Sequence, residues 1–409
     1  MNRLLRGERS ELAGRGPRLA LGAGGLGASI VIVSLNLRPA IVAVGPLTPT
    51  IQSGTGLSSS ATSLLTTVPL LCLGGFAAAA PPLARRAGFE RGVLAALALI
   101  VAGSALRLLA PVAALFAGSA LAGSGIAVAN VLIPAMIKRD FPQRTGAMMS
   151  LYSVGLQAGA TIASGLTLPL GAALGFGWRL SLAIWGLPAA AAAVLWLPRT
   201  LRSPAAAGPR GPRYRVWRCG LGWASAAFIG LQSAVYFSLT AWLPSLLRAN
   251  GMSGDRAGLM LSLVGFAGII GGLPMPLLAT RLRSQRMLVA FTVAVFLTGL
   301  AGLLVDPVPL AVVWAIALGL GQGCGLSLAL TLFTLRSRTA DGAAQLSGMA
   351  QAGGYLIAST GPLIAGAVHG LTGAWTVPVI VLLAALGPLT AAGWAIARPR
   401  FLEDEAEAP

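Results

Sequence analysis

Long apolar segments, separated by short basic or glycine-rich turns, make up most of this chain. The segments are about 20 to 25 residues long, the length that a helix needs to cross a hydrocarbon layer of about 30 Å. They are rich in Gly, Ala and Leu and do not show the strict alternation of outer-membrane strands. Because only a helix satisfies its own backbone hydrogen bonds in lipid, we predict helices. We expect twelve, at residues 19–44, 58–83, 92–110, 112–137, 146–173, 178–198, 219–247, 256–280, 287–305, 308–333, 343–370 and 374–397.

One segment near the middle of the chain breaks the apolar pattern. Residues 199–218 are rich in Pro, Gly and Arg, which is typical of a linker. The predicted fold class is an all-α membrane protein with twelve transmembrane helices in two pseudo-symmetric six-helix bundles. The expected domains are a basic cytoplasmic tail, an N-terminal bundle, a cytoplasmic linker, a C-terminal bundle and a second tail, at residues 1–18, 19–198, 199–218, 219–397 and 398–409.

The two halves share short motifs at an offset of 195 residues. Gly56-Leu57-Ser58 precedes the second predicted span, and Gly251-Met252-Ser253 precedes the eighth. A basic turn follows each of these spans, so that Arg86 aligns with Arg281 and Arg91 with Arg286. Such internal repeats are typical of transporters in which one half rocks against the other around a site at the membrane midplane.

The composition and charge fit a membrane protein. Hydrophobic residues make up 56% of the chain and charged residues only 10%, whereas a soluble domain is about a quarter charged. The net charge is +18, but 24 of the 29 Lys and Arg residues lie on one side of the predicted spans. This asymmetry predicts a bacterial-type inner membrane protein with both termini in the cytoplasm. We therefore expect contact with anionic membrane lipids and no nucleic-acid partner.

The four repeated arginines, Arg86, Arg91, Arg281 and Arg286, form a candidate gate. Cations in these turns can pair with carboxylates or with helix C-termini of neighbouring spans and hold the inner face closed. The alternative is that they set the topology only.

Arg38 is the candidate that the sequence favours most for binding substrate. It lies inside the first predicted span, where a central arginine costs about 2.5–3.5 kcal/mol. All eleven acidic residues lie in predicted loops or tails, so no carboxylate at membrane depth neutralises it. Pro39 removes a helical hydrogen bond, and we expect the span to bend there. Our hypothesis is that Arg38 binds an anionic substrate; the alternative is that it reaches the outer interface or helix-end carbonyls.

Neutral polar side chains inside other predicted spans complete the candidate substrate site. Amides and phenols supply hydrogen bonds for a small polar solute, and aromatic rings wall a pocket. The alternative for each is a hydrogen bond between helices, worth about 0.6 kcal/mol on average. The candidates are Asn36, Gln157, Gln232, Tyr236, Gln322 and Tyr355.

Glycines recur at four-residue spacing in two spans. Gly155 and Gly159 form a GxxxG motif in the fifth span, and Gly321 and Gly325 form another in the tenth. Small residues at this spacing let helices approach closely. We expect them to serve packing or hinge motion rather than chemistry.

Several of these segments together resemble the major facilitator superfamily over the whole chain, and more narrowly its cyanate/2-nitroimidazole permease branch (CynX/NimT type). The resemblance implies alternating access and a small anion or small polar heterocycle as substrate. It also favours Gln157, Gln232 and Tyr236, because spans one, five and seven usually line the cavity in such proteins. The segments that carry the resemblance are Asn36-Leu37-Arg38-Pro39-Ala40, Gly45-Pro46-Leu47, Leu65-Thr66-Thr67-Val68-Pro69-Leu70, Leu231-Gln232-Ser233, Ala241-Trp242-Leu243-Pro244 and Ala340-Asp341-Gly342-Ala343-Ala344-Gln345-Leu346-Ser347-Gly348.

The expected function is secondary active or facilitative transport of a small polar solute. An efflux carrier for drug-like or amphipathic compounds is the alternative, and a sensor without flux also fits the sequence. An enzyme is not expected, because the chain has one histidine and no acid at membrane depth. The three cysteines are scattered and form no metal-binding pattern, so we predict no cofactor and no metal. We expect a monomer, because the two halves already enclose a pathway.

Overall fold

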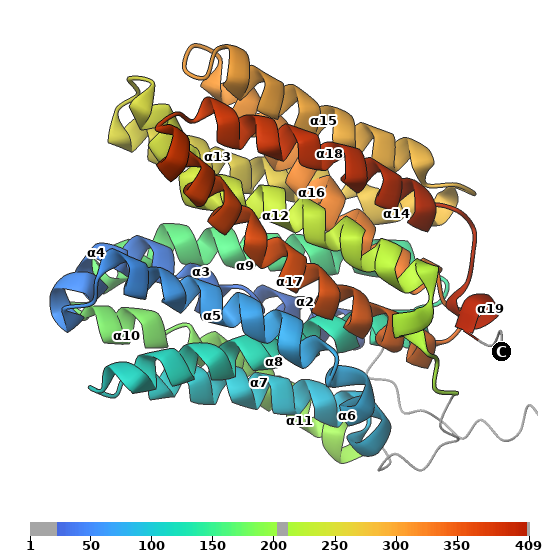
Figure 1. Ribbon diagram of the computed structural model, residues 1–409. Coiled ribbons are helices and arrows are strands. Elements are labelled where there is room, and N and C mark those ends of the chain that lie inside the picture. The colour runs from blue at the N-terminus through green and yellow to red at the C-terminus, as the bar shows by residue number, and fades with distance from the viewer. Residues whose placement is uncertain (1–22, 203–211, 407–409) are drawn as a thin grey trace, which may run out of the picture.

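A computed structural model describes residues 23–202 and 212–406, and in these residues the chain is helical. Figure 1 shows the helices of the two halves as two bundles, the N-terminal one below and the C-terminal one above. The N-terminal half contains α2 (Ala23–Leu35), α3 (Pro39–Val42), α4 (Val44–Thr55), α5 (Ser59–Ala77), α6 (Ala80–Ala87), α7 (Phe89–Leu106), α8 (Val112–Asp140), α9 (Thr145–Ala173), α10 (Trp178–Ala183) and α11 (Gly186–Arg202).

The C-terminal half begins with the short 3-10 helix η1 (Val216–Arg218). Eight further helices follow, of which the last is a short helix after the final span. They are α12 (Gly220–Ala249), α13 (Gly254–Gly272), α14 (Pro274–Arg281), α15 (Arg286–Val305), α16 (Ala311–Leu335), α17 (Ala340–Thr372), α18 (Thr376–Ile396) and α19 (Leu402–Ala406).

The helices have the length and apolarity of membrane spans. Within the described residues, nine continuous segments are long and apolar enough to cross a membrane, and the bent pair α5–α6 raises this to ten. The other two predicted spans correspond to α9 and α17, which are 29 and 33 residues long but carry more polar side chains. The predicted fold class is confirmed.

The predicted domain limits remain a prediction. The tail 1–18, part of the linker 199–218 and the last residues of the tail 398–409 lie outside the described residues.

Breaks at equivalent places support the internal repeat. In the N-terminal half, α5 and α6 meet at an angle of 54°, and α6 has proline in its first turn. In the C-terminal half, α14 begins with Pro274 directly after α13. Gly56 ends α4 at φ 70° and Gly251 follows α12 at φ 94°, a left-handed conformation that glycine adopts without steric cost. The motifs therefore repeat in conformation as well as in sequence.

The first span differs from its prediction. It was expected to end at residue 44, but the helical path continues through α4 to Thr55. Gly45 and Pro46 follow directly after that predicted end. Pro46 instead lies in the first turn of α4, where the backbone N–H groups lack helical acceptors, so its missing N–H costs nothing.

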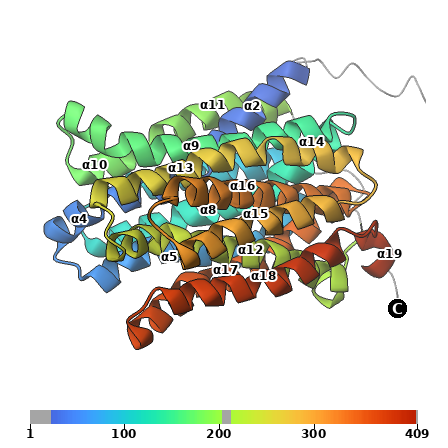
Figure 2. The ribbon, with the colours of Figure 1, turned by 90° about the horizontal axis from the view of Figure 1, so that it is seen from above.

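The two ends of the bundle differ in charge. One end, which we call the basic end, contains the turn between α6 and α7, the turns that precede α9, α15 and α17, and the helix α19. Ion pairs connect these turns: Arg139 contacts Glu90 at 2.5 Å, and Arg338 pairs with Asp404. The start of α2 and α19 both lie at this end, on the right in Figure 2. We call the other end, with α4 and α10, the opposite end.

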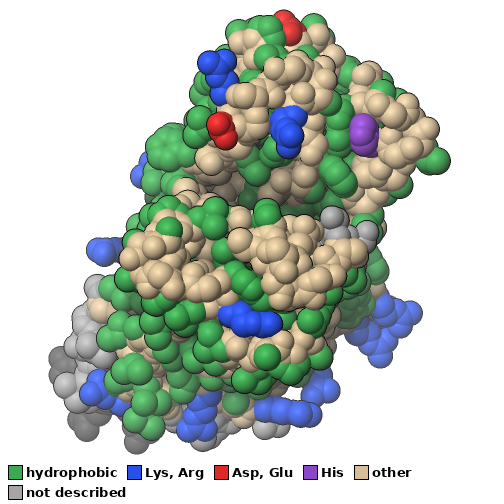
Figure 3. Space-filling model, turned by 90° about the vertical axis from the view of Figure 1, so that its left-hand side faces the viewer, with side chains coloured by type: hydrophobic (Ala, Val, Ile, Leu, Met, Phe, Trp, Pro, Cys, Tyr) green, Lys and Arg blue, Asp and Glu red, His purple; other side chains and the backbone are tan. Residues whose placement is uncertain are grey.

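The halves contact each other through the basic end and the middle of the bundle. Helix α5 packs against α17, and α9 packs against α13, α14 and α16. Ser150 on α9 donates a 2.7 Å hydrogen bond to the carbonyl of Leu273, and Lys138 on α8 donates one of 2.8 Å to the carbonyl of Thr334. Seen from the opposite end, the surface has a furrow between the two lobes (Figure 3).

Candidate substrate site

The first span breaks at Arg38, as Pro39 predicts. Helix α2 ends at Leu35, and Arg38 is the residue that precedes α3, with φ −125° and ψ −33°. Its carbonyl accepts hydrogen bonds from the N–H groups of Ile41 and Val42. The break therefore presents the Arg38 side chain inside the bundle, where it is only 8% exposed.

Arg38 is a buried cation at the junction of the two halves. The phenol groups of Tyr152 on α9 and Tyr355 on α17 lie close enough to interact electrostatically with its guanidinium. Within residues 23–202 and 212–406, Arg38 takes part in no ion pair, and its buried Nε has no hydrogen-bond acceptor. A guanidinium in this state strongly favours an added anionic or polar acceptor.

A chain of polar contacts runs from Tyr152 across the boundary between the halves. The Tyr152 hydroxyl donates a 3.0 Å hydrogen bond to Oδ1 of Asn130 on α8. The Asn130 carbonyl accepts one of 3.2 Å from Nε2 of Gln351 on α17, which also donates to Ser347 at 2.8 Å. Gln351 and Tyr355 are four residues apart and share a helix face. Both rings that lie near Arg38 therefore belong to one interface.

Gln157 and Gln322 meet directly, although they come from different halves. Nε2 of Gln157 on α9 donates a 2.8 Å hydrogen bond to Oε1 of Gln322 on α16. Both side chains are buried. The sequence named both residues as candidates but gave no reason to pair them.

Gln232 lies on α12, fully buried. Its Nε2 donates hydrogen bonds to Ser233 Oγ at 2.6 Å and to the Ile229 carbonyl at 3.3 Å. Its Oε1 is buried without a donor among the described residues. Tyr236, one turn further on, is half-buried and packs against Phe237 with ring centroids 5.3 Å apart.

Four buried polar atoms near these contacts have no hydrogen-bond partner in the described part of the chain. Arg38 Nε and Ser153 Oγ can donate, whereas Gln232 Oε1 and Gln351 Oε1 can accept. Buried polar atoms in native proteins are almost always hydrogen-bonded, so each such atom calls for an explanation. A small solute with both acceptor and donor groups would satisfy atoms of both kinds.

Asn36 has a local structural role. Its Nδ2 donates a 2.8 Å hydrogen bond to the Ile32 carbonyl, one turn back on α2. That bond satisfies a carbonyl at the end of the helix, which the break leaves without its usual partner. Substrate binding by Asn36 remains a prediction, with this nitrogen already engaged.

The gate arginines lie at the basic end, but the ion pair between the halves involves a neighbour. Arg85 Nη1 on α6 lies 3.4 Å from Asp341 Oδ2 on α17. Arg86, Arg91 and Arg281 are exposed, and Arg286 is half-buried. The sequence singled out the repeated positions, whereas Arg85 faces Asp341, the acidic residue in the first turn of α17. A gating role for Arg86, Arg91, Arg281 and Arg286 remains a prediction.

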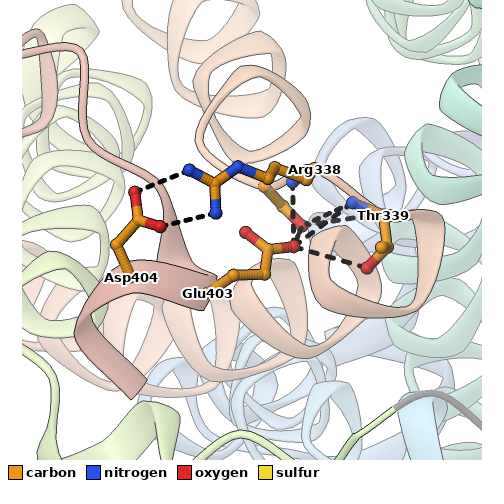
Figure 4. A network of polar contacts seen from close by, with 5 residues as sticks. Arg338, Thr339, Glu403 and Asp404 are labelled. Atoms are coloured by element: carbon orange, nitrogen blue, oxygen red, sulfur yellow. Dashed lines mark hydrogen bonds and ion pairs between the residues drawn. The ribbon is translucent and has the colours of Figure 1, made fainter. Parts of the chain in front are cut away.

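The chain end after α18 is tied to the same half by a cluster of polar contacts (Figure 4). Oε1 of Glu403 accepts hydrogen bonds from the Ser337 hydroxyl and from the N–H groups of Arg338 and Thr339, at 2.8 to 3.2 Å. Asp404 pairs with both Nη atoms of Arg338. Glu403 therefore binds the N-terminus of α17.

Arg107 was missed as a structural residue, because its place near the end of a span suggested an outer-side charge. It is fully buried, and its Nη1 donates a 2.6 Å hydrogen bond to the Ala40 carbonyl on α3. Its side chain packs on Gly118, where a Cβ would approach Arg107 Cγ to 2.8 Å. Arg107 thus supports α3, the short helix that follows Arg38. The sequence alone does not show that Gly118 faces Arg107, so it gives little indication that Arg107 is buried.

No group of three or more His, Cys, Asp or Glu side chains that could hold a metal occurs in the described ranges.

Comparison with known proteins agrees with this architecture. The model of the Major Facilitator Superfamily matches residues 25–362. The chain belongs to the major facilitator superfamily. Proteins of this superfamily are transporters. A solved superfamily structure, a proton:xylose symporter (XylE) bound to 6-bromo-6-deoxy-D-glucose, has a TM-score of 0.72 and 13% identity, and covers 94% of this chain and 98% of its own. At that identity the likeness shows the fold alone.

Three curated relatives cover most of the chain. The transporter YycB of Bacillus subtilis (strain 168), described as uncharacterized, is 39% identical over 91% of this chain and 93% of its own. The 2-nitroimidazole transporter of Escherichia coli (strain K12) is 38% identical over 86% and 90%. The cyanate transport protein CynX of the same organism is 33% identical over 84% and 90%. The predicted membership of the cyanate/2-nitroimidazole permease branch is confirmed.

Proposed function

We propose that this superfamily member is a secondary carrier that moves a small anion or a small nitro-heterocycle by alternating access, with Arg38 as the anion-binding group. The observation that carries the proposal is the state of Arg38. Its cation is buried where the halves meet, and its Nε has no acceptor in the described part of the chain. A bound negative charge would compensate for the cost of burying this cation.

The neighbouring groups suit a solute of a few atoms. The phenols of Tyr152 and Tyr355 lie close enough to interact electrostatically with Arg38, and the unpaired Oε1 atoms of Gln232 and Gln351 can accept hydrogen bonds. The names of two relatives point the same way, since cyanate is a small anion and 2-nitroimidazole offers nitro oxygens as acceptors and a ring N–H as donor. Either solute could accept hydrogen bonds from Arg38, but only 2-nitroimidazole has an N–H group that could also satisfy an amide oxygen.

The arrangement of the halves supports a state that is closed at the basic end. The Arg85–Asp341 ion pair and the Lys138 hydrogen bond to the Thr334 carbonyl join the halves there. The furrow in Figure 3 lies at the opposite end. By the positive-inside rule the basic end faces the cytoplasm, so solute would enter this state from outside.

Ligand-dependent thermal stability of the purified protein in detergent tests the proposal. Cyanate, 2-nitroimidazole, small carboxylates and amphipathic cations are screened against the wild type, Arg38→Ala and Arg38→Lys. A ligand present at about 100 times its Kd adds roughly 2.7 kcal/mol to the stability of the folded form. We expect cyanate or 2-nitroimidazole to stabilise the wild type but not Arg38→Ala. Arg38→Lys should respond weakly, because an ammonium lacks the planar fork of a guanidinium.

Arg248→Ala is the matched control, because Arg248 is an exposed arginine near the end of α12. It should respond as the wild type does. Flux of the stabilising ligand into proteoliposomes then separates a carrier from a sensor. Stabilisation by amphipathic cations alone, unchanged in Arg38→Ala, would overturn the proposal in favour of an efflux carrier.

A further inference from the structure

A pocket with a volume of about 680 Å³ opens at the basic end, beside the boundary between the halves. Its walls come from α6 of the N-terminal half, from residues 213–217 before α12, and from α17 of the C-terminal half. The volume lies within the usual range for small-molecule sites. The pocket is separate from the Arg38 site, and the inference below does not depend on the identity of the transported solute.

Hydrogen bonds fix the walls of the pocket. Gln345 on α17 accepts a 2.9 Å hydrogen bond from the N–H of Tyr214 and donates one of 3.1 Å to the carbonyl of Pro212. This double contact holds the chain on both sides of Arg213 against α17. Arg85, which also lines the pocket, is held by its ion pair with Asp341. The backbone around Arg213 and the side chain of Arg85 are therefore held in place.

The lining of the pocket is strongly basic. Three arginines contribute to it, Arg85, Arg86 and Arg213, and the described lining residues include no carboxylate. Arg86 and Arg213 are exposed, so their guanidinium groups are accessible to a ligand. Arginine binds phosphate oxygens in pairs through its planar fork, which makes a group of arginines a fitting receptor for phosphate.

Two tryptophans place this pocket at the membrane surface. Trp217 lines the pocket and is 50% exposed, and Trp223 on α12 is 51% exposed. Their rings pack edge to face with centroids 6.0 Å apart, and Trp223 Nε1 donates a 3.0 Å hydrogen bond to the Trp217 carbonyl. Exposed tryptophans near span ends are enriched at the level of lipid headgroups. Basic pockets between membrane helices on the cytoplasmic side bind acidic headgroups.

We propose that this pocket binds a phosphate-bearing anion, supplied by the headgroup of an acidic phospholipid or by a soluble phosphate ester. The phosphate contacts Arg86 from the N-terminal half and Arg213 from the start of the C-terminal half. One ligand then bridges the halves next to the Arg85–Asp341 ion pair and stabilises the state that is closed at the basic end.

Native mass spectrometry of the purified protein measures the retained lipid directly. The protein is mixed with phosphatidylglycerol or with phosphatidylcholine. sn-Glycerol 3-phosphate is then added as a soluble competitor for the bound lipid. The test variant is Arg86→Gln/Arg213→Gln. The control is Arg215→Gln/Arg283→Gln, which removes the same charge from two exposed arginines at the basic end that do not line the pocket. Arg85 is left unchanged to preserve its ion pair.

We expect the wild type and the control to retain phosphatidylglycerol in preference to phosphatidylcholine. The test variant should bind it about 30-fold more weakly, roughly fivefold for each arginine near an anionic headgroup. Displacement of the lipid by sn-glycerol 3-phosphate at low concentration would assign the site to a soluble phosphate ester. Equal retention by the test and control variants, or equal retention of both lipids by the wild type, would overturn the proposal. Neither result bears on transport through the Arg38 site.

Discussion

The amide nitrogen of Gln157 donates a 2.8 Å hydrogen bond to the amide oxygen of Gln322, and this bond joins the two halves within the membrane-spanning region. Gly268 on α13 packs against both amides: a Cβ there would lie 2.9 Å from Gln157 Nε2 and 3.2 Å from Gln322 Oε1. Because the pair crosses the boundary, any motion that separates the halves at this level must break it. The pair therefore contributes to the stability of one conformation rather than to the folding of either half.

A double-mutant cycle measures this contribution. Gln157→Leu and Gln322→Leu each leave one buried amide without its partner, so each should lower the free energy of unfolding. The two effects should couple by about 0.6 kcal/mol, the average for hydrogen bonds between membrane helices. Unfolding in mixed detergent is the measurement. As a control, the changes in unfolding free energy caused by Gln157→Leu and Gln232→Leu should be additive, because these amides have no mutual hydrogen bond. Additivity in the first pair would contradict our interpretation.

The Arg85–Asp341 ion pair should bias the protein towards closure at the basic end. Asp341→Asn removes its charge, and because both side chains are partly exposed we expect a shift of only about 0.2–1 kcal/mol. Distances between spin labels on α6 and α17 should show a larger population that is open at the basic end. Glu90→Gln is the control, because the Glu90–Arg139 ion pair lies within the N-terminal half. An equal shift in both variants would speak against a role for Arg85 in gating.

Much of the fold follows from the length and apolarity of the segments. The break at Arg38 was predictable because Pro39 removes a helical hydrogen bond, and the repeated Gly56 and Gly251 adopt the left-handed conformation that their motif suggests. The course of α4 was not predictable, because Gly45 and Pro46 are helix breakers in most positions but are tolerated in a first turn.

The candidate site was only partly predictable. Polar residues inside spans are rare enough to stand out, which is why Arg38, Gln157 and Gln322 were found. The contacts between these side chains depend on helix rotation and on packing between the halves. Neither can be inferred from a single sequence. For the same reason, the sequence did not show that Arg85 rather than Arg86 contacts Asp341, since adjacent residues on a helix differ by about 100° in direction.

Gly159 allows a close approach of α9 to the break in the first span. A Cβ at Gly159 would collide with the carbonyl oxygen of Leu35, the last residue of α2. Gly159→Ala should therefore force the helices apart and destabilise the protein by about 1–3 kcal/mol, as overpacking of a core does. It should also weaken substrate binding, because the displaced backbone leads directly to Arg38.

Gly165→Ala is the matched control on the same helix, since a Cβ there meets nothing within 4 Å. It should leave stability unchanged or raise it slightly, because alanine favours the helix over glycine. Thermal unfolding and ligand titration of both variants provide the comparison. If Gly159→Ala proved as stable as Gly165→Ala, the close contact between α9 and α2 would be wrong.

Glu403 should make the stability of the C-terminal half depend on pH. Burial raises the pKa of the Glu403 carboxyl, but hydrogen bonds from Ser337 and from the N–H groups of Arg338 and Thr339 lower it more, so the net pKa lies below its usual 4.5. A depressed pKa means that the ionised form stabilises the folded state. This contribution is fully present above about pH 4.5 and is lost as the pH falls through the lower pKa of the folded state.

Glu403→Gln tests this linkage, because it keeps the shape of the side chain and removes its titration. The variant keeps an acceptor oxygen but loses its charge, so it should unfold more easily at neutral pH by about 1 kcal/mol, the difference between hydrogen bonds to charged and to neutral groups, and the difference from the wild type should shrink below pH 4.5. Asp404→Asn is the control, because the Asp404–Arg338 pair is half exposed and should contribute under about 1 kcal/mol. Thermal unfolding from pH 3.5 to 7.5 measures both. A difference between Glu403→Gln and the wild type that stays constant over this range would show that the Glu403 carboxylate does not stabilise α17 through its charge.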